Sequence, residues 1–554
     1  MQPAARFGVA SRKHFKGEFW MDQGDWWRYG IFYQIYPRSF QDSNGDGVGD
    51  INGAIARLPY LKSIGIDAVW LSPIFPSPMA DFGYDISDYT GIDPLFGTMA
   101  DFDALLAAVH ESGLKIILDL VPNHTSDQHP WFAGARSARD NPKRDWYVWR
   151  DPKRDGGPPN NWLSDFGGSA WQYDEATGQY YYHAFLAEQP DLNWRNPKVR
   201  EAIYDVMRFW LRKGVDGFRV DVIWHLIKDT HFRDNPPNPH FVEGRPPHEK
   251  LLTQYSTDQP EVHEVVAEMR RVIDEFDNRV LIGEIYLPLH RLVAYYGNNL
   301  AGAQMPFNFA LLATLWSARS IERVIADYER ALPAGAWPNW VLGNHDRPRI
   351  ASRVGRDQAR VAAMLLLTLR GTPTLYYGDE IGMHQVAVAP DQVHDPFEKN
   401  VPGIGVGRDG CRTPMQWDAT AHAGFSTAST WLPLADDYVQ ENVANLEADA
   451  ASILSLYRAL IALRKQLPQL MTGSYEPVAA QEDILLYRRI GADGANVIAL
   501  NFGTEPVSIS SSSIGFGHEI LLSTFLDRQG ERIEGTLDLR ANEGAILGTP
   551  AQAG

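Results

Sequence analysis

The chain has 554 residues, of which 44% are hydrophobic and 22% are charged, as is ordinary for a globular protein with a large core. Its length corresponds to roughly two to four domains. The formal net charge of -18 argues against a nucleic-acid partner, because phosphate binding requires a basic surface, and it leaves a neutral small substrate as a good fit.

Residues 1–25 form an expected N-terminal extension. They carry charged and aromatic side chains but no apolar stretch of about 7 to 15 residues, so we expect no secretory signal. No apolar run elsewhere approaches the roughly 20 residues of a membrane helix. The single cysteine, Cys411, excludes intrachain disulfides. We therefore expect a cytoplasmic protein without a membrane partner.

Short apolar segments alternate with amphipathic helical stretches along most of the chain. This alternation predicts an α/β fold, a (β/α)₈ TIM barrel in which eight parallel strands form a closed sheet. The expected strands are residues 31–36, 68–71, 115–121, 217–222, 280–285, 303–309, 340–343 and 374–377.

Two parts of the chain depart from this alternation. Residues 122–196 are rich in Trp, Pro, Asn and Gly and are too long for a simple loop, so we expect a small domain inserted after the third strand. Short alternating strands with Gly and Ser turns predict a C-terminal antiparallel β-sandwich over residues 473–554. Residues 26–121 and 197–472 would then form the barrel.

The loop after the first expected strand has the spacing of a calcium-binding loop. A turn glycine stands at its sixth position, but Gly53 replaces the bidentate glutamate of an EF-hand at the twelfth. The loop predicts a structural Ca²⁺ site, with Mg²⁺ or an empty Asp/Asn/Gly turn as the alternatives. The expected ligands are Asp42, Asn44, Asp46, the main-chain carbonyl of Val48, and Asp50.

Two strand ends carry carboxylates. In residues 217–221, side chains alternate between faces, so Phe218 would pack outward while Arg219 and Asp221 face inward. Glu284 ends the next expected strand. Barrel enzymes keep their chemistry at these ends, and an aspartate held ionised by an arginine near a protonatable glutamate suits glycoside hydrolysis. For these two strands alone, a structural Arg–Asp pair beside an unrelated glutamate is an equally good explanation.

Two further polar clusters close expected strands. Residues 119–124 (DLVPNH) follow the third strand, and residues 343–346 (GNHD) follow the seventh. A lone histidine at a strand end is usually a structural hydrogen-bonding residue. Two histidines beside carboxylates, all on one face of a barrel, favour a site.

Together these four segments resemble the four signature regions of the α-amylase family of glycoside hydrolases (family 13), in the same order and at similar spacing. The resemblance extends from Trp27 to about Leu467. Residues 189–194 (QPDLNW) and 412–417 (RTPMQW) resemble the oligo-1,6-glucosidase and α-glucosidase branch. The resemblance implies an exo-acting retaining α-glucosidase that takes disaccharides and short oligosaccharides such as maltose, isomaltose or sucrose, with transglucosylation as a further activity.

The resemblance also implies the roles of individual residues. Asp221 would be the nucleophile, Glu284 the general acid/base, and Asp346 the stabiliser of the transition state. Sugar contacts would come from Asp81, Tyr84, His124, Phe166, Arg219, His345 and Arg408. Related enzymes also carry a loop like residues 42–50, filled by Ca²⁺.

A charged pair is expected to close the sugar pocket. Asp81 would bind the far end of the terminal glucose and pair with Arg408, so that only a non-reducing end fits. Arg412 is a neighbour that could take the same role, and for Phe166 core packing is as good an explanation as a sugar contact.

The linkage and the acceptor stay open. Val222 resembles α-1,6-acting members of the family, whereas residues 228–247 resemble α-glucosidases with short α-1,4 substrates. The main alternative is a glucosyl-transferring or isomerising enzyme of the trehalose synthase or sucrose isomerase type. A non-catalytic barrel like the ectodomains of amino-acid transporter heavy chains fits poorly, because those lack the catalytic carboxylates.

Overall fold

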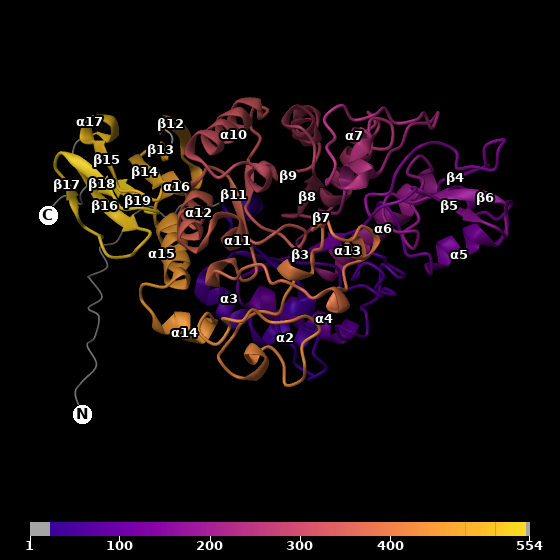
Figure 1. The fold of residues 1–554 in the computed structure, drawn as a ribbon, viewed down its shortest axis with the longest axis horizontal. Coiled ribbons are helices and arrows are strands. Elements are labelled where there is room, and N and C mark those ends of the chain that lie inside the picture. The colour runs from indigo at the N-terminus through magenta and orange to yellow at the C-terminus, as the bar shows by residue number, and fades with distance from the viewer. Residues whose placement is uncertain (1–22, 482, 516, 550–554) are drawn as a thin grey trace.

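The structure, a computed structural model, describes residues 23–549 apart from 482 and 516. The expected N-terminal extension, residues 1–25, lies almost wholly outside the described residues. Three parts follow one another along the longest axis of the molecule (Figure 1). A barrel lies in the middle, a C-terminal β-structure at one end, and a small sheet from the middle of the chain at the other.

The central part is a parallel barrel, which confirms the predicted fold class. Its eight-stranded sheet has the order β10-β11-β1-β2-β3-β7-β8-β9, and every neighbouring pair is parallel. The Asn339 side chain joins β9 to β10 through Pro306 O and Asn308 N, at 2.6 and 2.9 Å. The strands are β1 (Phe32–Ile35), β2 (Ala68–Leu71), β3 (Lys115–Leu120), β7 (Gly217–Val220), β8 (Val280–Ile285), β9 (Met305–Asn308), β10 (Asn339–Val341) and β11 (Thr372–Tyr376).

Two layers of inward-facing side chains fill the barrel. The lower layer is an apolar cluster that includes Phe32, Trp70, Ile282 and Phe307. Two residues further along the strands, Gln34, Asp119, Arg219 and Glu284 form a polar layer at the carboxyl ends. Because side chains alternate between the two faces of a strand, residues two positions apart both point inward, and a polar layer lies directly above a packed apolar layer.

Helices surround the barrel. Thr98 and Asp101 form a capping box at the start of α4, and α6 ends at Gly214, whose φ of 115° is left-handed. None of the helices among the described residues combines the length and apolar character needed to cross a membrane. The α-helices are α1 (Trp26–Tyr29), α2 (Ile51–Ala56), α3 (Leu58–Ile64), α4 (Met99–Glu111), α5 (Pro130–Ser137), α6 (Pro197–Lys213), α7 (Val262–Ile273), α8 (Leu289–Leu292), α9 (Ala310–Ala313), α10 (Ala318–Ala331), α11 (Ile350–Val354), α12 (Arg356–Thr368), α13 (Pro396–Asn400), α14 (Val443–Ala448), α15 (Ile453–Gln466), α16 (Pro468–Thr472) and α17 (Ser511–Ile514).

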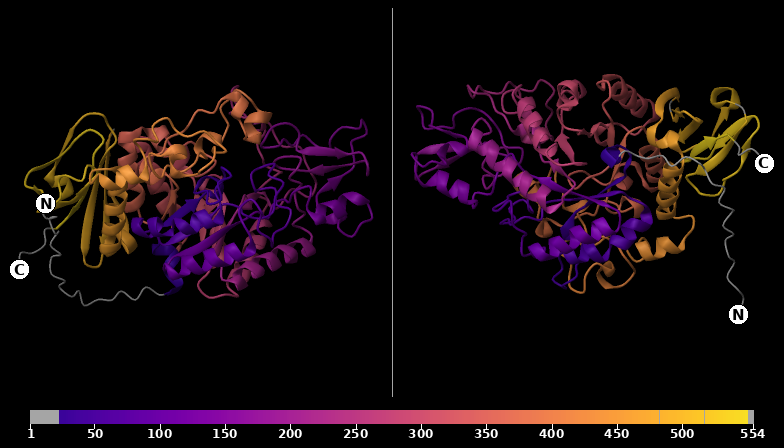
Figure 2. Two further views of the ribbon diagram at one scale, coloured as in Figure 1. Left: turned by 90° about the horizontal axis from the view of Figure 1, so that it is seen from below. Right: turned by 180° about the vertical axis from the view of Figure 1, so that it is seen from behind.

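Between β3 and α6 the chain forms a separate antiparallel sheet. It contains β4 (Trp149–Arg150), β6 (Gln179–Tyr182) and β5 (Trp171–Asp174), in that spatial order. Trp162, Trp171 and Tyr182 form its own apolar cluster. This sheet and α5 lie at the end of the molecule opposite the C-terminal strands, as two further views also show (Figure 2).

The C-terminal part is an antiparallel β-sandwich, as predicted. A six-stranded sheet, β12-β13-β14-β19-β16-β17, faces a two-stranded sheet, β15-β18, across a cluster that includes Leu486, Ile509 and Leu537. Helix α12 contacts β14 and β19. The bounds are β12 (Ser474–Gln481), β13 (Ile484–Gly491), β14 (Gly494–Asn501), β15 (Val507–Ser510), β16 (His518–Ser523), β17 (Arg532–Ile533), β18 (Thr536–Leu539) and β19 (Gly544–Gly548).

Candidate active site

A cavity of about 630 Å³ opens at the carboxyl ends of the barrel strands. Its lining brings together residues that are far apart in the sequence, on the loops after β2, β3, β7, β8, β10 and β11. Of the ten residues expected at the sugar site, only Arg219 does not line this cavity. The other nine are Asp81, Tyr84, His124, Phe166, Asp221, Glu284, His345, Asp346 and Arg408.

Arg219 lies directly beneath the cavity, with its side chain fully buried. Its Nη1 donates to Oδ1 of Asp221 at 2.7 Å and to Oδ1 of Asp119 at 2.9 Å. Its Nη2 lies 2.8 Å from Oε1 of Glu284. One guanidinium thus contacts three buried carboxyls. Its positive charge partly offsets the free-energy cost of burying their negative charges.

Asp221 and Glu284 share one local electrostatic environment. Burial raises the pKa of both carboxyls, and the like charge of Glu284 raises that of Asp221 further, while Arg219 opposes both shifts. Arg219, which was expected to favour the ionised form of Asp221, acts in that direction on both carboxyls at once and so opposes the effect of burial.

The backbone directly after Asp221 is strained. Val222 has φ 37° and ψ 45°, a left-handed conformation that a β-branched residue rarely adopts. In this conformation its N–H donates to Oε2 of Glu284 at 2.9 Å. A residue adjacent to Asp221 thus fixes the position of the second carboxyl.

Asp346 differs from that pair because cations surround it. Arg412 Nη2 donates to its Oδ1 at 2.9 Å, Arg408 Nη1 does so at 3.4 Å, and His345 Nε2 lies 3.3 Å from its Oδ2. Burial alone would raise the pKa of Asp346, but these neighbours hold it well below the usual range. Asp346 therefore remains an anion in the cavity at physiological pH.

A charged pair closes one end of the cavity. Arg408 Nη2 donates to Oδ1 of Asp81 at 2.7 Å and to Oδ1 of Asp395 at 2.6 Å. Asp395 also accepts from the Arg408 backbone N–H, which holds the guanidinium in place. Of the two arginines considered for this role, Arg408 contacts Asp81, while Arg412 contacts Asp346.

Aromatic rings form the remaining walls. Tyr84 stacks on one face of His345, with ring centres 5.4 Å apart, and Tyr36 stacks on the other face at 5.6 Å. Phe166 stacks on Phe397 at 5.2 Å, and the Arg408 guanidinium lies over the Phe166 ring. Phe166 therefore lines the cavity and is also packed against a neighbouring ring.

The two histidines are neutral at physiological pH. Burial lowers the pKa of His124 to about 4 and that of His345 to about 3. His345 contacts Gln34 Nε2 and the Tyr84 hydroxyl, each at 2.8 Å, while His124 contacts Gln189 Nε2 at 3.1 Å. Neutral imidazoles held in this way offer hydrogen bonds to sugar hydroxyls.

Sequence reasoning missed three residues that organise this site. Asp119 accepts from Arg219 and Tyr84, and burial raises its pKa to about 7. The sequence did carry a signal for Asp119. It lies on the inward face of its strand, two residues before the expected end at residue 121, and it pairs with Arg219 on the neighbouring strand. Asp395 had no local signal, because its partner Arg408 meets it only in the folded chain. The third residue is Lys228.

Lys228 lies beside Asn123 and Asp191, two buried residues on the chain that follows β3. Its Nζ contacts Oδ1 of Asn123 at 2.8 Å and Oδ2 of Asp191 at 2.5 Å. The Lys228 ammonium is buried, and its positive charge neutralises the buried Asp191 carboxylate.

The loop of residues 42–50 satisfies many of its own oxygens. Both carboxylate oxygens of Asp42 accept backbone N–H groups, and Asp50 caps α2 by accepting from Gly53 N. Among the described residues, no group of three His, Cys, Asp or Glu side chains could hold a metal. Asp46 accepts one backbone N–H through Oδ1, from Val48. A metal here would depend on Asn44 and the Val48 carbonyl as well as carboxylates, a set of hard oxygens that suits Ca²⁺.

Comparisons with known proteins agree with this geometry. A sequence model of the α-amylase catalytic domain matches residues 34–473. The salivary α-glucosidase of Anopheles gambiae is 44% identical over 512 residues, which cover 88% of this chain and 86% of that protein. The oligo-1,6-glucosidase of Halalkalibacterium halodurans is 41% identical over 517 residues, covering 86% and 90%.

Solved structures are also similar to this chain. An α-glucosyl transfer enzyme superposes with a TM-score of 0.89 and is 41% identical, covering 94% of this chain and 99% of that one. The trehalulose synthase of Pseudomonas mesoacidophila MX-45 superposes with a TM-score of 0.86 at 36% identity, with the same coverage.

Proposed function

The chain belongs to the α-amylase family of glycoside hydrolases, and from this we propose that it acts as an exo-acting, retaining α-glucosidase. Its substrates are small α-glucosides, from which it removes the terminal non-reducing glucose. One observation carries the exo assignment: the buried ion pair of Arg408 and Asp81 closes the cavity beside the three acidic residues. A chain that continued past the bound glucose would meet this pair.

In the first step, the Asp221 carboxylate attacks the anomeric carbon of the terminal glucose. Glu284 gives its proton to the glycosidic oxygen, the bond between that oxygen and the anomeric carbon breaks, and the remaining sugar leaves as an alcohol. Burial raises the pKa of Glu284, and this favours the protonated acid that the step needs. Arg219 stabilises the negative charge that remains.

In the second step, Glu284 takes a proton from water, and the water oxygen attacks the anomeric carbon. The bond to Asp221 breaks, and glucose leaves with its original α configuration. Asp346, which stays anionic, would accept hydrogen bonds from sugar hydroxyls as positive charge develops on the ring. His124 and His345 would hold hydroxyls of the same glucose.

A transferase is the second candidate function. It is favoured by two solved structures similar to this chain, an α-glucosyl transfer enzyme and a trehalulose synthase. The outer part of the cavity offers polar groups for an acceptor sugar, from Asp165, His248 and Glu249. If a sugar hydroxyl replaces water in the second step, the same residues transfer glucose instead of releasing it.

The test is a proton NMR time course with maltose, isomaltose, sucrose and trehalose. We expect wild type to release α-glucose first, and Asp221→Asn to be slower by about a thousandfold or more, because the nucleophile is removed. Asp205→Asn, an exposed change on α6, is the matched control and should behave as wild type. The fastest substrate identifies the preferred linkage.

Each of the other possible results of the NMR time course would change a specific part of the proposal. New disaccharides in place of free glucose would reassign the protein as a transferase or isomerase. β-Glucose as the first product would contradict retention, and an active Asp221→Asn would contradict the assigned nucleophile.

We extend the proposal to the loop of residues 42–50 as a structural Ca²⁺ site, with Mg²⁺ as the alternative ion. Asp42, Asn44, Asp46, Val48 and Asp50 supply the oxygens. The loop follows β1 and does not line the sugar cavity, so its metal would act on stability and not on the reaction.

We also propose that the protein is cytoplasmic, since its only cysteine allows no intrachain disulfide. Fractionation of the native host tests this location.

A further inference from the structure

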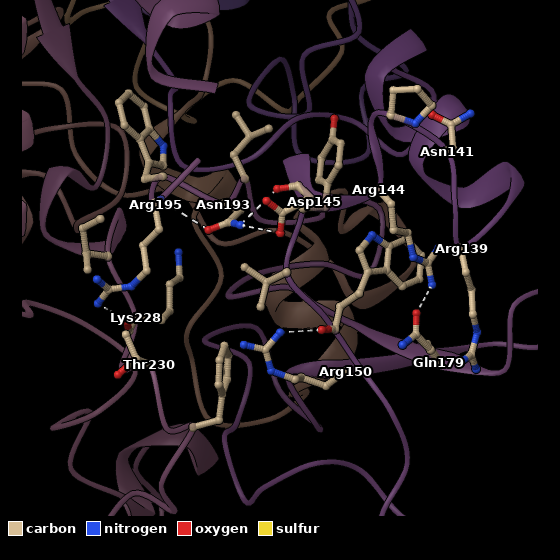
Figure 3. Close-up of a pocket in the computed structure, with 18 of the residues that line it drawn as sticks. Arg139, Asn141, Arg144, Asp145, Arg150, Gln179, Asn193, Arg195, Lys228 and Thr230 are labelled. Carbon is tan, nitrogen blue, oxygen red and sulfur yellow. Dashed lines mark hydrogen bonds between the residues drawn. The ribbon is translucent and has the colours of Figure 1, made fainter. Parts of the chain in front are cut away.

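The sugar cavity has room for more than the terminal glucose. Its volume of about 630 Å³ is in the usual range for a ligand of about the size of a disaccharide. The other large cavity, of about 690 Å³, lies between the inserted sheet and the chain that follows β7, and no residue lines both (Figure 3). Residues of that other cavity, among them Arg150 and Lys228, are therefore not available to the rest of a substrate, which has to bind in the outer part of the sugar cavity.

Three charged side chains of the sugar cavity lie outside the group assigned to the terminal glucose: Asp165, Glu249 and Arg347. Glu249 is neutralised, because Nε of Arg245 lies 2.5 Å from its Oε2. Asp165 and Arg347 differ from it, because neither pairs with a charged side chain in the part of the chain that the structure describes. The outer lining thus offers one unpaired anion and one unpaired cation.

The Asp165 carboxylate accepts no hydrogen bond from a described residue, although only 28% of its side chain is exposed. Nε2 of His225 lies 3.9 Å from its Oδ2, beyond hydrogen-bonding distance. Burial lowers the pKa of His225 well below its usual value, so this imidazole is neutral. Burial also raises the pKa of Asp165. The carboxylate therefore lacks a donor that would stabilise its negative charge.

Arg347 is the corresponding cation. It directly follows Asp346 in the chain, and its guanidinium lies 5.1 Å from the centre of the Tyr286 ring. Tyr286 is itself fixed, because its ring stacks on Phe309 at 4.3 Å and its hydroxyl accepts from Asn344 Nδ2 at 3.1 Å. The Arg347 side chain is exposed. N–H groups at the edge of its guanidinium therefore remain available to a ligand.

Both groups lie near the segments that carry the reacting carboxyls. Tyr286, the ring beneath Arg347, stands two residues after Glu284. His225, beside Asp165, belongs to the segment that follows the proposed nucleophile. Since a buried ion pair closes the other end of the cavity, the rest of a substrate extends outward past these two groups.

An anion and a cation without partners suit a neutral ligand that is rich in hydroxyls. A hydroxyl can donate to a carboxylate and can accept from a guanidinium, so one sugar satisfies both groups without carrying a charge. A leaving group without hydroxyls satisfies neither of them. A charged leaving group would be repelled by one of the two.

We propose that Asp165 and Arg347 bind the sugar next to the terminal glucose, Asp165 as acceptor and Arg347 as donor of hydrogen bonds to its hydroxyls. The two residues thus select leaving groups that are rich in hydroxyls. In transfer, an acceptor sugar would bind to the same two residues. This inference rests on the proposed α-glucosidase function, in which the terminal glucose binds at the closed end of the cavity.

Steady-state kinetics with three substrates test the inference: the faster of maltose and isomaltose, methyl α-glucoside, and 4-nitrophenyl α-glucoside. The last two have no second sugar. Methanol, like a sugar, needs a proton from Glu284 in order to leave, whereas 4-nitrophenol leaves readily without one. The three substrates therefore separate a contact with the second sugar from an effect on the acid.

We expect Asp165→Ala and Arg347→Met each to lower kcat/KM for the disaccharide about tenfold, because a hydrogen bond to a charged group is lost. For the other two substrates, kcat/KM should stay within about twofold of wild type. Asp165→Asn keeps an acceptor and Arg347→Lys keeps donors, so each should lose only about threefold on the disaccharide. Asp155→Ala and Arg154→Met remove the same groups from an exposed turn outside the lining and should behave as wild type.

Failure of this inference is distinguishable from failure of the proposed function. If wild type releases glucose from none of the three substrates, the proposed function fails and the inference with it. If wild type is active but Asp165→Ala and Arg347→Met keep its kcat/KM for the disaccharide, only the inference is overturned. It is also overturned if methyl α-glucoside loses as much as the disaccharide does, because the two residues then act on the terminal glucose or on the acid.

Discussion

Arg219 is the residue on which the acidic centre of this protein depends. Its guanidinium contacts Asp119, Asp221 and Glu284 from below and remains fully buried. A neutral side chain at this position would leave several buried carboxyls without a counter-charge. Burial would then raise the pKa values of these carboxyls without opposition, which favours their protonated forms.

Arg408 has a different role in the proposed function, where its ion pair with Asp81 would close the end of the sugar pocket. We expect Arg408→Gln to lower kcat/KM for maltose by about a hundredfold, since Asp81 would be left buried without its cation and the terminal glucose would lose a fixed partner. Steady-state kinetics with maltose measure this effect. The thermal midpoint, recorded by circular dichroism, shows whether the variant is folded.

The control for this change is Arg233→Gln, which removes an exposed arginine that pairs with Asp229 outside the cavity. It should leave kcat/KM within about twofold of wild type. A folded Arg408→Gln enzyme that also stays within twofold would show that the ion pair does not form the sugar pocket.

At the scale of elements, the strands place the chemistry and the loops after them shape the pocket. The alternating register of β3, β7 and β8 brings Asp119, Arg219 and Glu284 into one layer above an apolar floor. The closing pair, in contrast, joins the loop after β2 to a loop more than 300 residues later. Strand ends thus hold the reacting groups, and long loops decide what can reach them.

The loop after β1 carries the prediction that belongs to this scale. If residues 42–50 bind Ca²⁺, then EDTA should lower the thermal midpoint by about 3 °C or more, because a metal that binds only the folded chain stabilises it. Elemental analysis of the dialysed protein should find one calcium per chain. The kcat with maltose at 25 °C should stay within about twofold.

Asp46→Ala should remove both the metal and the effect of EDTA. Asp155→Ala is its matched control, because Asp155 also accepts a backbone N–H two residues along the chain but lies outside the loop. If the wild-type protein holds no metal and its thermal midpoint does not respond to EDTA, then residues 42–50 form a turn without a metal site.

At the scale of the whole molecule, two buried arginines meet where the barrel borders the C-terminal sandwich, and one of them, Arg489, joins the two parts. Arg489 on β13 donates to the carbonyls of Thr368, Leu470 and Gly473. Arg464 on α15 donates to the carbonyls of Leu367, Leu369 and Gly371. Carbonyls at and after the end of α12 thus receive donors from two other elements.

We expect Arg489→Met to destabilise the protein by about 2 to 4 kcal/mol, because it leaves buried carbonyls without donors. Urea unfolding measures this loss. The neighbouring Arg488→Met is the control: Arg488 pairs with partly exposed Glu476 and should cost about 0.5 kcal/mol or less. Equal unfolding midpoints for the two variants would contradict the role of Arg489.

Much of this molecule was predictable from local sequence. Strands and their inward residues follow from a period of two, and all eight barrel strands were placed within about two residues at both ends by that signal. In the sandwich, the alternating pattern indicates strands at residues 484–489, 496–502 and 519–526, which correspond to β13, β14 and β16, whereas it does not indicate β12, β15 and β17 to β19. Several of these strands are short, and pairing across the sheet defines them better than their own residues do.

For the site, only the residues that directly follow a recognisable strand could be predicted from the sequence. Asp221, Glu284 and Asp346 follow buried strands, so their place at one end of the barrel could be inferred from the sequence. Asp395 and Lys228 could not be found in this way, because each acts through a partner distant in the sequence.

The sequence by itself determined the barrel, the sandwich and the identity of the acidic residues, because hydrophobic period and strand-end position are properties of neighbouring residues. Only the tertiary structure decided which arginine meets Asp81 and how one guanidinium is shared among three carboxyls. Those features depend on burial and on distances between remote segments, which exist only once the chain has folded.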